Sequence, residues 1–218
     1  GQFFITMELL EGQALQTILH ERGQLSPGNV VGIARQACRG LDYAHSQGVI
    51  HRDIKTANLF VTTERVVKIM DFGLAKVLEE VRGATTLVSG TPYYMSPEQV
   101  RGLTLDRRSD LFSLTICLYE LLTNQRLFLG ESDFETLEKI RKVDVEPPSV
   151  YNPHIPQELE DVIMKGLAKD PKLRFQSGSE MREALQKFMF NQSFYFTNKD
   201  LATTMQEAFA HELAMERR

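Results

Sequence analysis

Apolar and polar residues recur with the spacing of amphipathic helices over most of the chain. After Ser26-Pro27, for example, apolar positions follow one another at helical intervals along one face. Similar segments occur further along, and a shorter one ends at Gly23. We expect helices over residues 13–22, 26–47, 107–122, 132–142, 157–168 and 177–190. The pattern therefore predicts a mainly α fold.

Strand patterns are short and few. The opening stretch FFITMELLEG is an apolar run rich in strand formers, and we expect a strand that ends in a connector at Glu11-Gly12. Two further strands are expected at about residues 58–62 and 66–70, with a turn between them. Between residues 71 and 97 neither period is sustained, so we expect a long loop, which is usually functional or disordered.

Composition narrows the class of protein. With 218 residues, 42% hydrophobic and 25% charged, the chain can bury one sizeable core or two small ones. Its net charge of -4 gives no overall basic field of the kind that binds nucleic acid. Cys38 and Cys117 lie in apolar helical patterns, so we expect buried free thiols and a cytoplasmic location. We expect no membrane contact by this segment, although a longer parent protein could carry a membrane or sensor domain.

The candidate chemistry lies on either side of the predicted strand pair, in the stretches HRDIKTAN and DFG. In order, Asp53, Lys55, Asn58 and Asp71 form the set that phosphoryl transfer from ATP requires. Asp53 suits the carboxylate that accepts the proton of the attacking hydroxyl, while Lys55 can place its ammonium on the transferring phosphate. Mg²⁺ prefers oxygen ligands, which Asn58 and Asp71 supply. Alone, the first stretch would ordinarily be a solvated loop and the second a turn with a core phenylalanine, but their ordered combination favours a catalytic site.

At these residues the sequence resembles the protein kinase family, and more closely the serine/threonine kinases of bacteria. The resemblance covers residues 3 to about 188 and includes GTPYYMSPE, RRSDLFSL and KDPKLRF in family order. Asp110 matches a buried helix aspartate that holds the catalytic loop from below, and Arg174 matches an arginine that pairs with Glu98. The resemblance therefore implies that these three residues are structural rather than reactive.

The sequence departs from the family pattern at three places near these motifs. Thr56 replaces the proline that often follows the lysine, Phe112 replaces a tryptophan and Thr115 replaces a glycine. None of the three removes a catalytic group, so they bear on local rigidity and substrate docking rather than on the reaction type.

The resemblance implies an enzyme that transfers the γ-phosphate of ATP to serine or threonine hydroxyls of protein substrates, with ATP and Mg²⁺ as cofactors. Thr91 is expected to hydrogen-bond Lys55 and Asp53, a feature that implies serine or threonine rather than tyrosine as the acceptor. The implied nucleotide-binding residues are Met7 as gatekeeper, Glu8 and Leu10 in the hinge, Phe60 on the floor of the adenine pocket, and Asp71 at the metal. The stretch around Met7 could also be a plain buried strand.

Arg52 suggests regulation, because in the family this arginine is neutralised by a phosphate on the long loop. Thr85 and Thr86 are the leading candidates to carry that phosphate, with Ser89 behind them. The alternative is that these hydroxyls only keep the loop soluble.

Residues 1–50 contain no G-x-G-x-x-G and no V-A-I-K, the stretches that cradle phosphates in the family's first lobe. We therefore expect a kinase C-terminal lobe, helical and with a small β-hairpin that carries the catalytic loop and Asp-Phe-Gly, and no N-terminal lobe. The expected divisions are residues 1–12 as the last strand of the N-terminal lobe and the hinge, 13–190 as the C-terminal lobe, and 191–218 as a helical extension.

Two classes of function stay open. In the first, the chain is a fragment of an active kinase, inactive without the N-terminal lobe that is its natural partner. In the second, it is a pseudokinase-like binding or scaffold module that acts through its helical surface. The intact catalytic set favours the first class. An exposed apolar face or exchange of the long loop would allow self-association, and an amphipathic tail at 197–218 could pack on the lobe, link to another domain or dock a partner.

Overall fold

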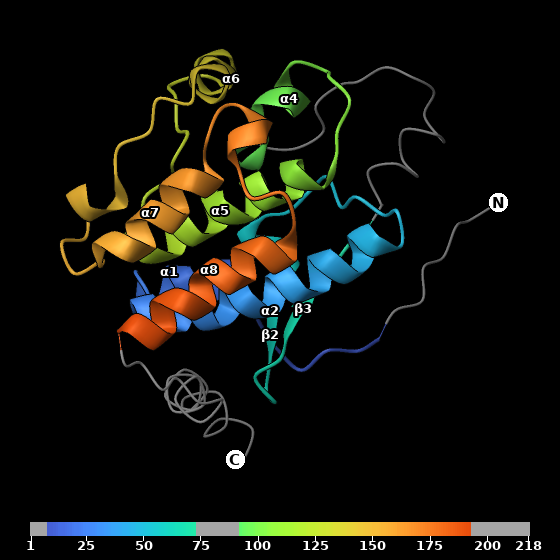
Figure 1. Cartoon of the computed structure of the whole chain (residues 1–218), viewed down its shortest axis with the longest axis vertical. Coiled ribbons are helices and arrows are strands. Elements are labelled where there is room, and N and C mark those ends of the chain that lie inside the picture. The colour runs from blue at the N-terminus through green and yellow to red at the C-terminus, as the bar shows by residue number, and fades with distance from the viewer. Residues whose placement is uncertain (1–7, 73–91, 193–218) are drawn as a thin grey trace.

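The computed structural model describes residues 8–72 and 92–192, and helices dominate that part of the chain (Figure 1). The helices are α1 Leu15–Arg22, α2 Pro27–Ser46, α4 Pro97–Val100, α5 Arg107–Thr123, α6 Asp133–Lys142, α7 Gln157–Gly166 and α8 Gly178–Asn191. Short 3-10 turns are η1 Thr56–Asn58, η2 Pro92–Tyr94, η3 Pro148–Val150 and η4 Pro171–Leu173. Met7, Thr85, Thr86, Ser89, Thr91 and the predicted tail helix lie outside the described residues.

The predicted helices are confirmed to within about two residues at each end, and local chemistry explains where they begin. The Ser26 hydroxyl accepts a hydrogen bond from the Asn29 amide at the start of α2, which has Pro27 at its first position. Ser177 caps α8 in the same way. α7 ends at Gly166, two residues earlier than expected.

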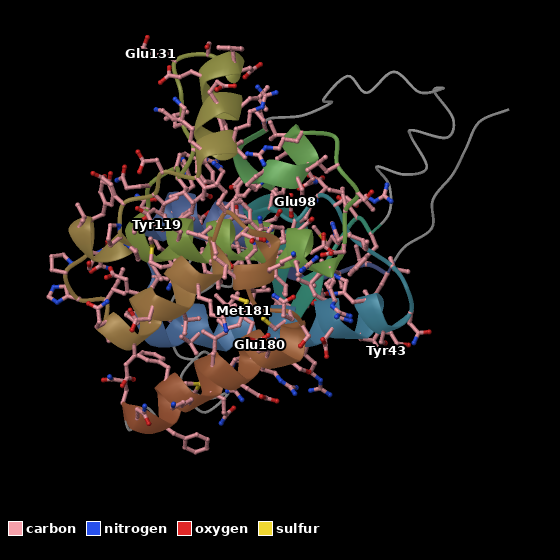
Figure 2. The ribbon with its side chains drawn as sticks, turned by 45° about the horizontal axis from the view of Figure 1, so that its top comes forward. Tyr43, Glu98, Tyr119, Glu131, Glu180 and Met181 are labelled. Carbon is pink, nitrogen blue, oxygen red and sulfur yellow. The ribbon has the colours of Figure 1, made fainter. Side chains whose placement is uncertain are left out.

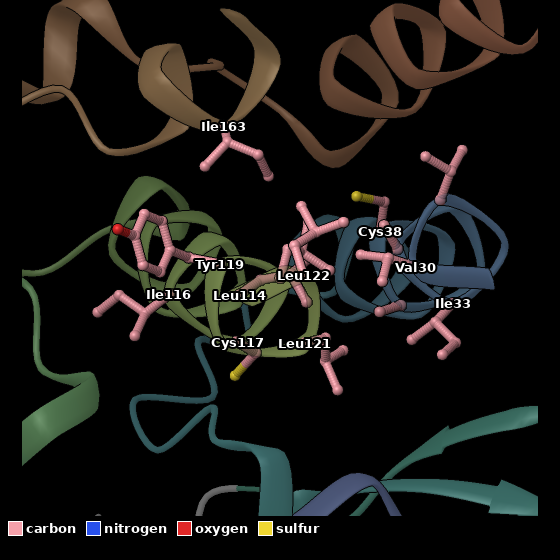
Figure 3. Close-up of a cluster of buried hydrophobic side chains, with 14 of the residues drawn as sticks. Val30, Ile33, Cys38, Leu114, Ile116, Cys117, Tyr119, Leu121, Leu122 and Ile163 are labelled. Atoms are coloured by element: carbon pink, nitrogen blue, oxygen red, sulfur yellow. The ribbon is translucent and has the colours of Figure 1, made fainter. Parts of the chain in front are cut away.

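Helix α5 lies at the centre of the structure, because every side chain from Ser109 to Thr123 is buried. A helix that is buried on all sides must be surrounded by other elements, and α5 packs against α2 and α7 while α2 packs against α8. Figure 3 shows Cys38 of α2, Leu122 of α5 and Ile163 of α7 in one buried cluster.

The two cysteines belong to this core. Cys38 and Cys117 are free thiols with no exposed surface, as the sequence predicts. Burial raises the pKa of the Cys38 thiol to about 12 and the pKa of Cys117 well above its ordinary value. Neither thiol is therefore a reactive thiolate at neutral pH.

The sheet is small, and most of the stretch in which the sequence predicts a first strand lies outside the described residues. The strands β1 Gly12–Ala14, β2 Leu59–Thr62 and β3 Val67–Ile69 pair antiparallel in that order. Residues 8–11 form no strand, and Leu9 is 90% exposed. Among the described residues, the sheet begins at Gly12, which pairs with Thr62 and has a φ of +146°. A side chain there would overlap the Val61 carbonyl oxygen, so glycine is what lets the chain approach β2. The β2–β3 hairpin is confirmed.

Among the helices of the described residues, none combines the length and apolar character that a membrane span requires.

Thr115, one of the departures from the family pattern, is accommodated by Gly166. The Thr115 hydroxyl donates to the Leu111 carbonyl at 2.7 Å inside α5. A Cβ added at Gly166 of α7 would overlap the Thr115 hydroxyl and lie 2.8 Å from its methyl carbon. The extra bulk of Thr115 on α5 is thus accommodated because Gly166 on α7 has no side chain.

We predict that Gly166→Ala lowers the free energy of unfolding by about 1 to 3 kcal/mol, since the added methyl overpacks the α5–α7 contact. Thr115→Ala in the same chain should restore most of that loss. The matched control is Gly32→Ala in α2, where an added Cβ meets nothing within 4 Å and a gain of about 0.5 to 1 kcal/mol is expected. Urea unfolding measures all four proteins. If Gly166→Ala were as stable as the parent chain, the close approach of the two helices would be wrong.

Candidate active site

The candidate site is built on a carboxylate in the first turn of α5. Asp110 is 1% exposed, and its two oxygens accept hydrogen bonds from the backbone amides of His51 and Arg52, each at 2.8 Å. The ring nitrogen Nε2 of His45 lies 2.7 Å from Asp110 Oδ2. Arg52 has a φ of +70°, an uncommon conformation for a residue with a side chain, and these bonds help to hold it. Helix α5 thereby fixes the backbone immediately ahead of Asp53.

Three predicted residues meet just beyond this anchor. Lys55 Nζ lies 2.7 Å from Asp53 Oδ2, and the Asn58 amide nitrogen donates to the Asp53 carbonyl at 2.9 Å and to its carboxylate at 3.2 Å. The side chains of Asp53 and Lys55 are 48% and 36% exposed. The structure therefore gathers an accessible carboxylate and an accessible ammonium on a loop whose backbone is held from below.

The end of β3 is tied to the same loop. His51 Nε2 lies 2.7 Å from the Met70 carbonyl oxygen, and the Met70 amide donates to the Asn58 carbonyl at 2.8 Å. Asp71 follows with a φ of +61°, and the Phe72 ring stands edge-on to the His51 ring at 4.6 Å between centroids. These contacts place Asp71 beside the loop that carries Asn58.

A divalent metal fits this pair only with help from other ligands. No group of three or more histidine, cysteine or acidic side chains suited to a metal occurs within residues 8–72 and 92–192. Asn58 and Asp71 offer one amide oxygen and one carboxylate. That set suits Mg²⁺, which is commonly held by one or two protein oxygens together with water and phosphate.

The predicted hinge residues are placed only in part. Glu8 is exposed, and its carboxylate lies 3.2 Å from Lys68 Nζ on β3. Leu10 is half-buried, as is Phe60, which pairs with Ala14 across the β1–β2 ladder. The structure thus brings Phe60 to the strand that follows the hinge residues.

A buried ion pair braces the helices below the loop. Arg174 donates to both oxygens of Glu98, at 2.7 and 2.9 Å, and Ser109 donates to the same carboxylate at 2.7 Å. The Arg174 guanidinium also donates to the Ala168 carbonyl and lies 4.5 Å from the Phe112 ring centroid. In Figure 2, Glu98 lies among the helices, unlike an outlying acid such as Glu131.

Comparison with known proteins decides the family. Residues 1–190 match the protein kinase domain. The chain belongs to the protein kinase family. Relatives of this kinase domain include the serine/threonine-protein kinase PknB of Mycolicibacterium smegmatis, 40% identical over 185 residues, and PknB of Mycobacterium tuberculosis, 38% identical over 185 residues. A probable serine/threonine-protein kinase of Clostridium perfringens, CPE1738, is 40% identical over 185 residues.

These alignments cover most of this chain but a much smaller share of each relative. Each takes in 84% of this chain, but 30% of the two PknB proteins and 27% of the Clostridium protein. The chain therefore spans less than a third of the length of the curated relatives it matches. The bacterial origin of these relatives agrees with the resemblance read from the motifs.

Sequence reasoning about this kinase domain missed a buried polar network beside the loop. The Thr56 hydroxyl lies 2.8 Å from the Tyr94 hydroxyl, which donates to Glu120 of α5 at 2.6 Å. Arg126 Nη1 lies 3.2 Å from the Glu120 carboxylate. Burial raises the pKa of Glu120 above its ordinary value and the pKa of Tyr94 far above its usual range. The departure from proline at Thr56 was the only sequence signal of this network.

We predict that Arg174→Met lowers the free energy of unfolding by about 3 to 5 kcal/mol, because it leaves the Glu98 carboxylate buried without its partner. The matched control is Arg141→Met, which removes a half-exposed pair with Glu138 at 2.6 Å and should cost about 1 kcal/mol or less. Urea unfolding at neutral pH measures both. Equal losses in the two variants would contradict the bracing role of the buried pair.

The same pair gives this variant a distinctive pH dependence. Burial opposes ionisation of Glu98, but hydrogen bonds from Arg174 and Ser109 outweigh it and lower the pKa of Glu98. In the parent chain this stabilisation is complete above the ordinary pKa of glutamate and is lost as the pH falls through the folded-state value. Without Arg174, burial should raise the pKa. The stability gap between parent and variant should therefore narrow as the pH falls through the raised Glu98 pKa of the variant, and narrow further as it falls through the folded-state pKa of the parent.

Proposed function

We propose that the chain supplies the catalytic-loop half of a serine/threonine protein kinase, which transfers the γ-phosphate of ATP to serine or threonine hydroxyls of proteins. The observation that carries the proposal is the cluster of Asp53, Lys55 and Asn58 on a loop held by Asp110. Family membership supports the reaction type.

Each group of the cluster has a chemical task in this reaction. Asp53 accepts the proton of the attacking hydroxyl, and the bond from Asn58 keeps its carboxylate in place. Lys55 carries its positive charge beside that carboxylate, where it stabilises the charge that develops on the transferring phosphate. Asn58 and Asp71 are the residues that would hold Mg²⁺, which neutralises the phosphates of bound ATP. Arg52 would receive a phosphate on Thr85 or Thr86 as the activating signal.

The groups that cover the phosphates in the family would come from a segment outside these 218 residues. Residues 8–50 of the structure contain one short strand and two helices, and their sequence contains no phosphate-cradling glycine loop. Without that cover, positioning of ATP and exclusion of water both fail, and each ordinarily contributes several kcal/mol to catalysis. The isolated chain should therefore bind ATP weakly and have negligible kinase activity.

Calorimetry with Mg²⁺-ATP tests the isolated chain. We expect no measurable binding up to millimolar ATP. Micromolar binding that disappears in Asp71→Asn would contradict this expectation and would mean that the cleft is completed in another way, for example by a second copy of the chain.

A hybrid protein tests the activity itself. The segment that precedes the matched region in the Mycolicibacterium relative would be fused ahead of Gly1, so that the hybrid keeps Met7 and the predicted hinge, and Mg²⁺-ATP binding would be verified first. The hybrid should phosphorylate serine and threonine in a protein substrate, and Asp53→Asn should lower the rate about a hundredfold to ten-thousandfold. Binding of Mg²⁺-ATP without transfer above the Asp53→Asn background would overturn the proposal and favour a scaffold function.

A further inference from the structure

Gln99 of α4 forms hydrogen bonds through both the oxygen and the nitrogen of its side-chain amide. At the start of this helix, the Gln99 backbone amide donates to the Ser96 hydroxyl at 3.3 Å, and the Ser96 amide donates to Gln99 Oε1 at 2.9 Å. This reciprocal pair is a capping box, which satisfies two amides that the helix itself leaves without partners. The capping box uses only the oxygen of the Gln99 side chain.

The nitrogen of the same side chain reaches the catalytic loop. Gln99 Nε2 donates to the backbone carbonyl of Arg52 at 2.7 Å. That carbonyl belongs to the peptide bond that leads directly into Asp53, while the amide of Arg52 is bound by Asp110 from α5. Arg52 also has the left-handed φ of +70°. The residue ahead of Asp53 is therefore held from two helices, with α5 on its amide and α4 on its carbonyl.

A second contact joins the same two segments on the other side of Asp53. Three residues after it, the Thr56 hydroxyl lies 2.8 Å from the hydroxyl of Tyr94. Tyr94 and Gln99 both belong to the stretch 92–100, so the loop is bound to this stretch before and after its exposed carboxylate. A displacement of residues 92–100 would pull on the backbone at Arg52.

We propose that Gln99 is a positioning residue that couples residues 92–100 to the backbone of Asp53 through the Arg52 carbonyl. The inference deepens the proposed function, because it gives the stretch that follows the hydroxyl-bearing segment 73–91 a direct mechanical link to the base. This link is a hydrogen bond from the neutral Gln99 side-chain amide, so it does not depend on phosphorylation.

The variant Gln99→Glu separates the two roles of the side chain. A carboxylate of the same shape still accepts from the Ser96 amide and is favoured at a helix N-terminus, but it cannot donate to the Arg52 carbonyl. The variant Gln99→Met removes both contacts without adding charge. Amide hydrogen exchange by NMR on the full 218-residue chain reads the loop residue by residue, and the urea midpoint reads the whole fold.

We expect exchange at the Arg52 and Asp53 amides to accelerate about fivefold to tenfold in both variants, the scale of one lost hydrogen bond. The urea midpoint should fall slightly in Gln99→Glu, by no more than the loss of one hydrogen bond, and further in Gln99→Met, which also loses the capping contact. Exchange in Gln99→Glu that equals that of the parent chain would overturn the proposal. An acceleration spread evenly over α2 and α5 would also overturn it, because it would indicate a purely structural role.

The hybrid kinase adds a catalytic readout. There, Gln99→Glu should lower kcat about tenfold with little change in the KM for ATP, since the variant moves the base and not the nucleotide contacts. A parent hybrid without phosphotransfer would count against the proposed function alone, because exchange on the 218-residue chain still decides the coupling. An active parent hybrid with an unchanged kcat in the variant would count against the coupling alone.

Discussion

The arrangement of the site depends on the hydrogen bonds that the buried Asp110 carboxylate accepts from the loop. A carboxylate taken out of water is strongly destabilising unless donors surround it, and here two backbone amides and the His45 ring do so. Because these amides belong to His51 and Arg52, the need to satisfy one buried charge fixes the backbone ahead of Asp53. The anchor is rigid in turn because α5, which carries it, is buried along nearly its whole length.

Two further polar contacts fix the position of the loop relative to α5. The Glu98–Arg174 pair joins residues that are 76 positions apart in the chain. Ser109, the neighbour of Asp110, donates a hydrogen bond to the same Glu98 carboxylate. The Tyr94–Glu120 hydrogen bond adds a second link to α5, in the C-terminal half of the helix. Tyr94 also contacts Thr56 of the loop. Such pairs add little net stability when intact but are costly to break, so their effect is to make alternative positions of the loop unfavourable. The Asp53 carboxylate and the Lys55 ammonium can then stay exposed on a loop whose backbone is fixed.

Local patterns account for what the sequence predicts well. Helices α2 and α8 have apolar stripes at helical spacing, and a serine at the start of each satisfies a first-turn amide, so their bounds can be read without any tertiary information. Strand β1 escapes this reasoning, because Gly12 joins a strand only through its pairing with Thr62, fifty residues away. Gln99 escapes it for the same reason. The Arg52 carbonyl that its amide reaches is set by the fold. The compensation between Thr115 and Gly166 is likewise visible only once α5 and α7 are side by side.

Asp110→Asn tests most directly whether α5 holds the loop that carries Asp53 in place. An asparagine has one acceptor oxygen and cannot bind both loop amides as the carboxylate does. Amide hydrogen exchange would be compared between the parent chain and this variant. The account predicts slow exchange at His51 and Arg52 in the parent, faster by about tenfold or more in the variant, with the amides in the middle of α2 much less affected. Rapid exchange of these two amides in the folded parent chain would contradict it.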